Sequence, residues 1–102
     1  MIPAVEQHRS RIADLCRRYD VRTLDLFGSA ATGEFDAQLS DLDFMVEFSD
    51  RKPEGAADRY FGLLEGLQSV LGRQVDLVMR SAVRNPYFLR TADSQRQNLY
   101  AA

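Results

Sequence analysis

The chain has little cysteine and histidine and no long apolar run, and each shortage excludes a class of protein. Cys16 is the single cysteine among 102 residues, which rules out an internal disulfide and a cysteine-rich zinc site. We expect it to be a small buried apolar residue, with a reactive thiol as the alternative. The single histidine, His8, is the only candidate base for a Ser-His-Asp mechanism and is expected to face solvent on a helix.

Two further absences concern location and partners. No apolar run reaches about 18 residues and no charged-then-apolar leader occurs, so we expect a cytoplasmic protein that does not span a membrane. Thirteen basic against fifteen acidic residues give a net charge of −2 and a pI near 5.3. Binding of long nucleic acid through its phosphates needs a basic surface, so we expect none here.

The length and the apolar spacing predict one small domain, residues 1–102. The predicted fold class is α/β (α+β), a small mixed β-sheet covered by helices, because the elements alternate as α-β-β-α-β-α. Asn85 followed by Pro86 favours the start of the last helix. The predicted elements are a helix over 4–19, a strand over 21–27, a turn over 28–39, a strand over 42–48, a helix over 56–71, a strand over 75–79 and a helix over 86–100.

The predicted helix over 56–71 is amphipathic and ends at Gly72. Its buried stripe is expected to face the sheet, so these residues should lie in the core. The stripe consists of Tyr60, Phe61, Leu64, Leu67 and Leu71.

Three aspartates lie on the predicted strands. Asp41 and Asp43 are two residues apart, so in a strand they project to the same side while Leu42 and Phe44 anchor the strand in the core. Asp76 lies in the next strand, within about 5 Å laterally if the two strands are neighbours. Three carboxylates this close repel one another unless a cation neutralises them. The pattern therefore predicts a metal site formed by these three aspartates.

The chemistry of that site is predicted from its ligands. Carboxylate oxygens favour Mg²⁺ or Mn²⁺ over zinc, and two such ions would suit in-line attack on a phosphoryl group. Gly28 and Ser29 end the first strand, where backbone N–H groups and a hydroxyl can hold the oxygens of a nucleoside triphosphate. We assign Asp41 and Asp43 to metal coordination, and Asp76 to coordination and to activation of the attacking hydroxyl.

Each feature also has a purely structural explanation. Gly-Ser is common in ordinary turns, and Asp-x-Asp is common at solvated strand ends. Asp76 is harder to explain this way, because aspartate is disfavoured in the middle of a strand among Val, Leu and Met. A salt bridge to Arg80 is the alternative for Asp76. Asp25, in the first strand, could support the site or lie at the surface.

The stretch LFGSAATGEFDAQLSDLDFMVEF followed by QVDLVM resembles the nucleotidyltransferase superfamily in its smallest form, the minimal nucleotidyltransferase (MNT) domain. The ending NPYFLRTADSQRQNLYAA resembles that of MNT antitoxins. The resemblance implies a nucleotidyltransferase fold, triphosphate binding at Gly28 and Ser29, and metal binding at Asp41, Asp43 and Asp76. It also implies transfer of AMP from ATP to a hydroxyl. Relatives often carry arginine where this chain has Thr32, which puts the efficiency of transfer in doubt.

The resemblance further implies a partner, a HEPN-domain RNase toxin bound in a hetero-oligomer and adenylylated, in known cases on tyrosine. Two alternatives are a non-catalytic antitoxin that inhibits by binding alone and a small-molecule nucleotidyltransferase. The latter usually has a second domain for its acceptor, and this chain has no room for one. A docking face for the partner is expected on the last predicted helix, at Tyr87, Phe88 and Leu99.

Overall fold

The computed structural model describes residues 3–27, 42–49, 52–83, 85–86, 90 and 96–102. Alternating apolar residues form the strands, and a helical apolar period forms the two longer helices. In chain order the elements are α1 (Pro3–Glu6), α2 (Arg9–Arg18), β1 (Val21–Phe27), β2 (Leu42–Phe48), α4 (Ala56–Leu71), β3 (Val75–Met79), the 3₁₀ turn η1 (Arg80–Ala82) and β4 (Gln97–Ala101).

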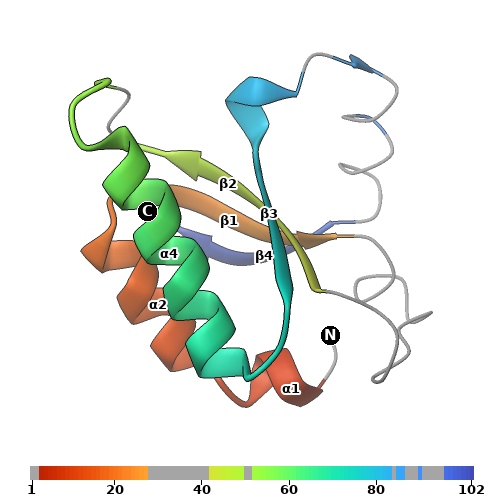
Figure 1. The fold of residues 1–102 in the computed structure, drawn as a ribbon. Coiled ribbons are helices and arrows are strands. Elements are labelled where there is room, and N and C mark those ends of the chain that lie inside the picture. The colour runs from red at the N-terminus through yellow and green to blue at the C-terminus, as the bar shows by residue number, and fades with distance from the viewer. Residues whose placement is uncertain (1–2, 28–41, 50–51, 84, 87–89, 91–95) are drawn as a thin grey trace.

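The strands form one mixed four-stranded sheet in the order β3-β2-β1-β4 (Figure 1). β1 pairs antiparallel with both β2 and β4, whereas β2 and β3 run parallel because α4 crosses over between them. The predicted class, a small mixed sheet with helices, is confirmed. The parallel β2–β3 pair has a consequence for the site, since both strands begin at the same edge of the sheet.

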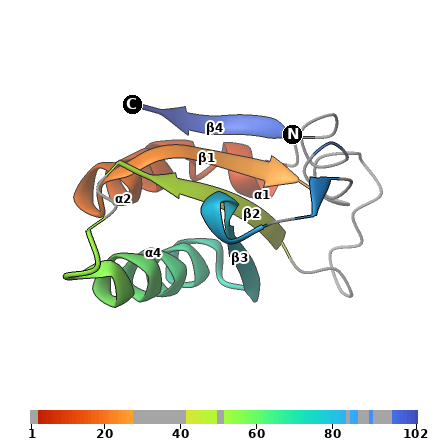
Figure 2. The same cartoon turned by 90° about the horizontal axis from the view of Figure 1, so that it is seen from above.

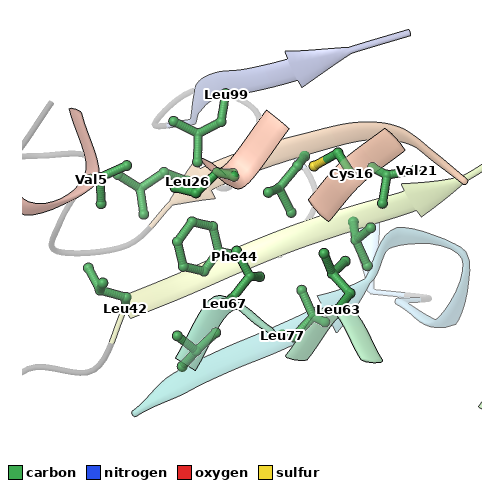
Figure 3. Packing of buried hydrophobic residues seen from close by; sticks show 14 of the residues in the cluster. Val5, Cys16, Val21, Leu26, Leu42, Phe44, Leu63, Leu67, Leu77 and Leu99 are labelled. Atoms are coloured by element: carbon green, nitrogen blue, oxygen red, sulfur yellow. The ribbon is translucent and has the colours of Figure 1, made fainter. Parts of the chain in front are cut away.

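Helices α2 and α4 pack side by side on one face of the sheet, with α2 against β1 and β4 and α4 against β3 (Figure 2). The core lies between this face and the helices, and Figure 3 shows its side chains pointing into that layer. Phe44, Leu24 and Leu67 are fully buried there. The phenol of Tyr60 donates a 2.6 Å hydrogen bond to the Leu77 carbonyl oxygen, which joins α4 to β3.

α4 approaches α2 closely because two glycines face it. A Cβ atom on Gly62 would lie 2.4 Å from the Tyr19 ring, and one on Gly66 would lie 2.6 Å from the Leu15 side chain. The absence of side chains at both positions lets the two helices pack together. Neither helix, nor any other within the described ranges, is long and apolar enough to cross a membrane.

The buried stripe predicted for α4 is wrong at one position. Phe61 is 55% exposed, whereas Leu63, which the prediction left out, is fully buried. Leu67 is buried as predicted, and Leu64 is partly buried against the core. The glycines that contact α2 determine which side of α4 faces the core. That side includes Leu63 and does not include Phe61.

The predicted helix over 86–100 is wrong at its C-terminal end. Pro86 and Arg90 have helical backbone conformations, but Gln97–Ala101 is the edge strand β4. Leu99 is 5% exposed and belongs to the core, so it cannot belong to the predicted docking face. Tyr87 and Phe88 of that face lie outside the described residues. Pairing with β1, far away in sequence, selects the strand conformation over the local helical pattern.

The predicted N-terminal helix over 4–19 is interrupted. Gln7 and His8 form a turn between α1 and α2, and α2 ends at Arg18. Val5, Ile12 and Cys16 are nevertheless all buried, as the helical spacing of the apolar residues indicated. The break therefore changes the path of the chain without changing which residues enter the core.

Candidate functional site

Asp43 and Asp76 are register partners. Each is the second residue of its strand, and the parallel pairing of β2 with β3 aligns Asp43 with Asp76 just as it aligns Met45 with Val78. Neighbouring strands lie about 4.8 Å apart, so the two carboxylates project side by side from the same face. The sequence predicted that Asp76 would lie beside the strand of Asp43 if the two strands were neighbours, and the strand pairing confirms that they are.

This carboxylate face is the side of the sheet opposite the helical layer. Phe44 and Leu77, which alternate with the aspartates, belong to the core cluster, so Asp43 and Asp76 point the other way. Asp43 is half-buried and Asp76 is exposed. Like charges directly opposite each other on neighbouring strands destabilise a sheet. Binding of a cation between the two carboxylates would relieve this repulsion.

The structural alternative for Asp76, a salt bridge to Arg80, is not found. Within the described part of the chain Asp76 takes part in no ion pair. The Arg80 guanidinium instead approaches the sulfur of Met45, with Nη1 3.7 Å from Sδ. Met45 lies on the carboxylate face, two residues beyond Asp43. Arg80 is therefore a cation over the middle of this face.

Three of the five predicted site residues fall outside the described residues, namely Gly28, Ser29 and Asp41, as does Thr32. Within the described ranges no group of three or more His, Cys, Asp or Glu residues is arranged to hold a metal ion. The two carboxylates that can be placed, Asp43 and Asp76, offer hard oxygen ligands with no nitrogen or sulfur ligand predicted beside them. This donor set suits Mg²⁺ or Mn²⁺.

Asp25 has a more specific environment than the sequence indicated. Its side chain is buried, and it hydrogen-bonds to two side chains at the start of β4: Asn98 Nδ2 donates to Oδ1 at 2.9 Å and Arg96 Nη1 donates to Oδ2 at 3.2 Å. Aspartate between Leu24 and Leu26 in a strand is as unfavourable as Asp76 among its apolar neighbours. The argument that singled out Asp76 in the sequence therefore applies equally to Asp25, and it could have identified Asp25 as a residue with a specific partner or role.

Cys16 is the buried apolar residue that its helical position predicted. Burial, opposed by the nearby Arg17, raises the pKa of its thiol from 9.0 to about 12. Thiolate is the reactive form of cysteine, so the side chain is inert at neutral pH. The alternative of a reactive thiol is therefore wrong.

A pocket of about 290 Å³ opens at the far end of β2 from Asp43, beside the start of α4. Neither Asp43 nor Asp76 lines it. Arg59 organises its rim by donating to the carbonyl oxygens of Lys52 at 2.7 Å and Glu54 at 3.0 Å. The pocket is lined by Glu47, Phe48, Lys52, Pro53, Ala56, Arg59, Met79 and Ser81.

Comparison with known families and sequences identifies relatives. Residues 9–99 match the family described as nucleotidyltransferase domain. The chain is 34% identical to a Methanocaldococcus jannaschii protein provisionally named a protein adenylyltransferase, over 87% of this chain and 84% of the relative. It is 35% identical to the protein adenylyltransferase MntA of Thermococcus cleftensis, over 71% of this chain and 69% of the relative.

Solved structures share the fold. A structure described as a minimal nucleotidyltransferase superposes with a TM-score of 0.77 and 26% identity, covering 91% of this chain and 90% of the other. A toxin–antitoxin crystal structure with AMP-PNP gives 0.71 and 24%, over 92% and 73%. A tri-AMPylated Shewanella oneidensis HEPN toxin in complex with an MNT antitoxin gives 0.66 and 21%, over 95% and 72%.

Proposed function

The chain belongs to the nucleotidyltransferase domain family, and we propose that it is a protein adenylyltransferase antitoxin. It transfers AMP from ATP to a hydroxyl, on tyrosine, of a HEPN-type RNase toxin and thereby neutralises that toxin. The observation that carries the proposal is the register pairing of Asp43 with Asp76 on the carboxylate face. The relatives named protein adenylyltransferase support the reaction. The complex of a tri-AMPylated HEPN toxin with an MNT antitoxin supports the partner.

The proposed site residues cover three roles: metal binding, phosphate binding and proton acceptance. Asp41, Asp43 and Asp76 would hold Mg²⁺, with Mn²⁺ as a substitute, and the bound ions would offset the negative charge of the triphosphate. Gly28 and Ser29 bind the phosphate oxygens. Asp76, the exposed member of the pair, accepts the proton of the tyrosine hydroxyl. The hydroxyl oxygen then bonds to the α-phosphorus, the bond from that phosphorus to the bridging oxygen breaks, and pyrophosphate leaves.

Intact-mass spectrometry of the partner tests the proposal. We expect a HEPN-domain protein to be encoded beside this chain, and this candidate partner is co-expressed with the chain or incubated with it, ATP and Mg²⁺. We expect mass additions of one AMP each, and none with the Asp41→Asn/Asp43→Asn double variant. Asp58→Asn is the matched control, because it removes an exposed carboxylate from α4, on the helical side of the sheet. Transfer that persists in the double variant would rule out the assigned site.

A toxicity assay separates this enzyme from a non-catalytic antitoxin. The double variant should fail to restore growth of cells that express the toxin, although it still binds the toxin in a pull-down. Full neutralisation by the double variant, together with an unmodified toxin, would show that binding alone suffices. That outcome would replace catalysis with complex formation as the basis of the antitoxin activity.

A further inference from the structure

The reaction proposed above does not use Asp25, the most buried carboxylate among the residues that the structure describes. Asp25 is 3% exposed, yet both of its oxygens accept hydrogen bonds, one from Asn98 and one from Arg96. The hydrogen bond from Arg96 is at the same time a salt bridge, in which the Asp25 side chain is 4% exposed and the Arg96 side chain 48% exposed. A charged group is rarely buried without a partner, and here the partner is a cation whose own side chain reaches the surface.

The location of this ion pair relates it to the proposed site. Asp25 is the cross-strand partner of Met45, and Met45 is two residues from Asp43 along β2. Asp25 and Asp43 are therefore diagonal neighbours on one face, with about 7–8 Å between their Cα atoms. Neither Asp25 nor Met45 belongs to the core cluster, although Leu24 and Leu26 do. The Arg96 guanidinium is thus held at Asp25 on the carboxylate face, and β1, which carries Asp25, is the neighbour of the strand that carries Asp43.

The charge balance of this face indicates what Arg96 can do. Asp43 and Asp76 make the start of β2 and β3 strongly acidic, and a triphosphate brought to that edge adds further negative charge. Arg80 and Arg96 are two guanidinium groups that the described residues place on this face, on either side of Met45. Arginine presents its donors in a planar fork, so bonding to a carboxylate at one nitrogen fixes the direction of the others.

We propose that Arg96 contacts the phosphate groups of the nucleotide and that Asp25, together with Asn98, positions its guanidinium for that contact. This inference rests on the proposed function, since it assigns a further residue to the same nucleotide site. Asp25 is then a positioning residue, and Arg96 is the group that touches the substrate. If Asp25 served only to hold β4 against β1, the hydrogen bond from Asn98 to Asp25 would be explained. That role would not require a half-exposed arginine on the carboxylate face.

Binding measurements on Arg96 variants test the inference. Dissociation constants for ATP and for adenosine are measured calorimetrically with Mg²⁺ present. We expect Arg96→Gln to weaken ATP binding about ten- to hundredfold while adenosine binding stays within about twofold, because only ATP carries the phosphates. Arg96→Lys should recover part of the loss. Arg17→Gln is the control, since Arg17 is an exposed arginine of α2 in an ion pair with Asp14.

The positioning role of Asp25 has its own readout. Asp25→Asn should weaken ATP binding about three- to tenfold, and adding it to Arg96→Gln should cause little further loss, because the two residues act through one contact. Thermal unfolding of each variant is recorded alongside. If Asp25→Asn does not fold, the half-exposed Arg96 variants still decide the question.

Three outcomes separate the inference from the function on which it rests. Equal ATP affinity in Arg96→Gln and the wild type, or an equal loss for ATP and adenosine, would overturn the role of Arg96 and leave the adenylyltransferase assignment intact. A wild type that binds ATP through Arg96 but transfers no AMP to its partner would overturn the assigned reaction alone. A wild type that binds no ATP would overturn both.

Discussion

The two faces of the sheet come from the same strands and have opposite chemistry. The face toward α2 and α4 carries Leu26, Phe44 and Leu77 in a buried core (Figure 3). The carboxylate face carries Asp25, Asp43 and Asp76. Alternation along each strand makes this separation unavoidable, because neighbouring residues point to opposite sides. The comparison teaches that stability is concentrated on one face, which leaves the other able to hold charges that folding alone would not favour.

The largest effect is expected on the core face. Phe44→Ala should lower the free energy of unfolding by about 3–5 kcal/mol, since it removes a fully buried ring and leaves a cavity. Phe61→Ala is the same substitution at a side chain that is 55% exposed, and it should cost less than about 1 kcal/mol. Urea denaturation measures both. Similar costs for the two variants would contradict the one-sided core.

A smaller loss in the free energy of unfolding is expected for Asp25, the carboxylate on the opposite face that has hydrogen-bond partners. Asp25→Asn should cost about 1–3 kcal/mol, because the substitution removes the charge that accepts hydrogen bonds from Arg96 and Asn98 in a buried setting. Denaturation without divalent ions measures the loss. A neutral result would mean that solvent replaces these hydrogen bonds at no cost.

The same substitution at Asp76 should act in the opposite direction. Asp76→Asn removes one of two like charges in register, so without metal the protein should be unchanged or more stable by up to about 1 kcal/mol. Asp25→Asn serves as the comparison on the same face. A clear loss of stability at Asp76 would show that its carboxylate has a structural partner after all.

The last effect is expected only above pH 9, and it reports whether water reaches the core. The pKa of the Cys16 thiol is raised by burial from 9.0 to about 12, so its stabilising contribution is complete below pH 9 and is lost as the pH rises toward 12. The sign follows from the unfolded chain, which releases the thiol proton first. The stability advantage of the wild type over Cys16→Ala should therefore be constant below pH 9 and shrink above it. A constant difference across that range would mean that water reaches Cys16.

Local patterns predicted most of the fold. Alternation placed β1 and β2 at their observed bounds, and the glycine after Leu71 marked the end of α4. β4 was missed because its five residues fit a helix as well as a strand, and only pairing with β1 distinguishes the two. Which side of α4 faces the core depends on the contacts of Gly62 and Gly66 with α2, and no pattern within α4 reveals these contacts.

The candidate site, like the fold, was predicted in part from local patterns and depends in part on long-range pairing. That Asp43 and Asp76 share a face follows from alternation once the strands are neighbours, but the parallel register that aligns them depends on the crossover through α4. Asp25 could have been singled out as an aspartate between two leucines, whereas its partners, Arg96 and Asn98, are more than seventy residues away in sequence. Long-range pairing of this kind is set by the assembled sheet, so local spacing could not supply it.

Calorimetric titration of the metal-free protein with Mn²⁺ and a non-hydrolysable ATP analogue tests the central claim most directly, since it asks whether the carboxylate face binds a metal-bound nucleotide. The wild type should bind both, and Asp43→Asn/Asp76→Asn should bind neither while remaining folded, as its thermal unfolding would show. Unchanged binding in that folded variant would contradict the account, because the paired carboxylates would then have no part in the site.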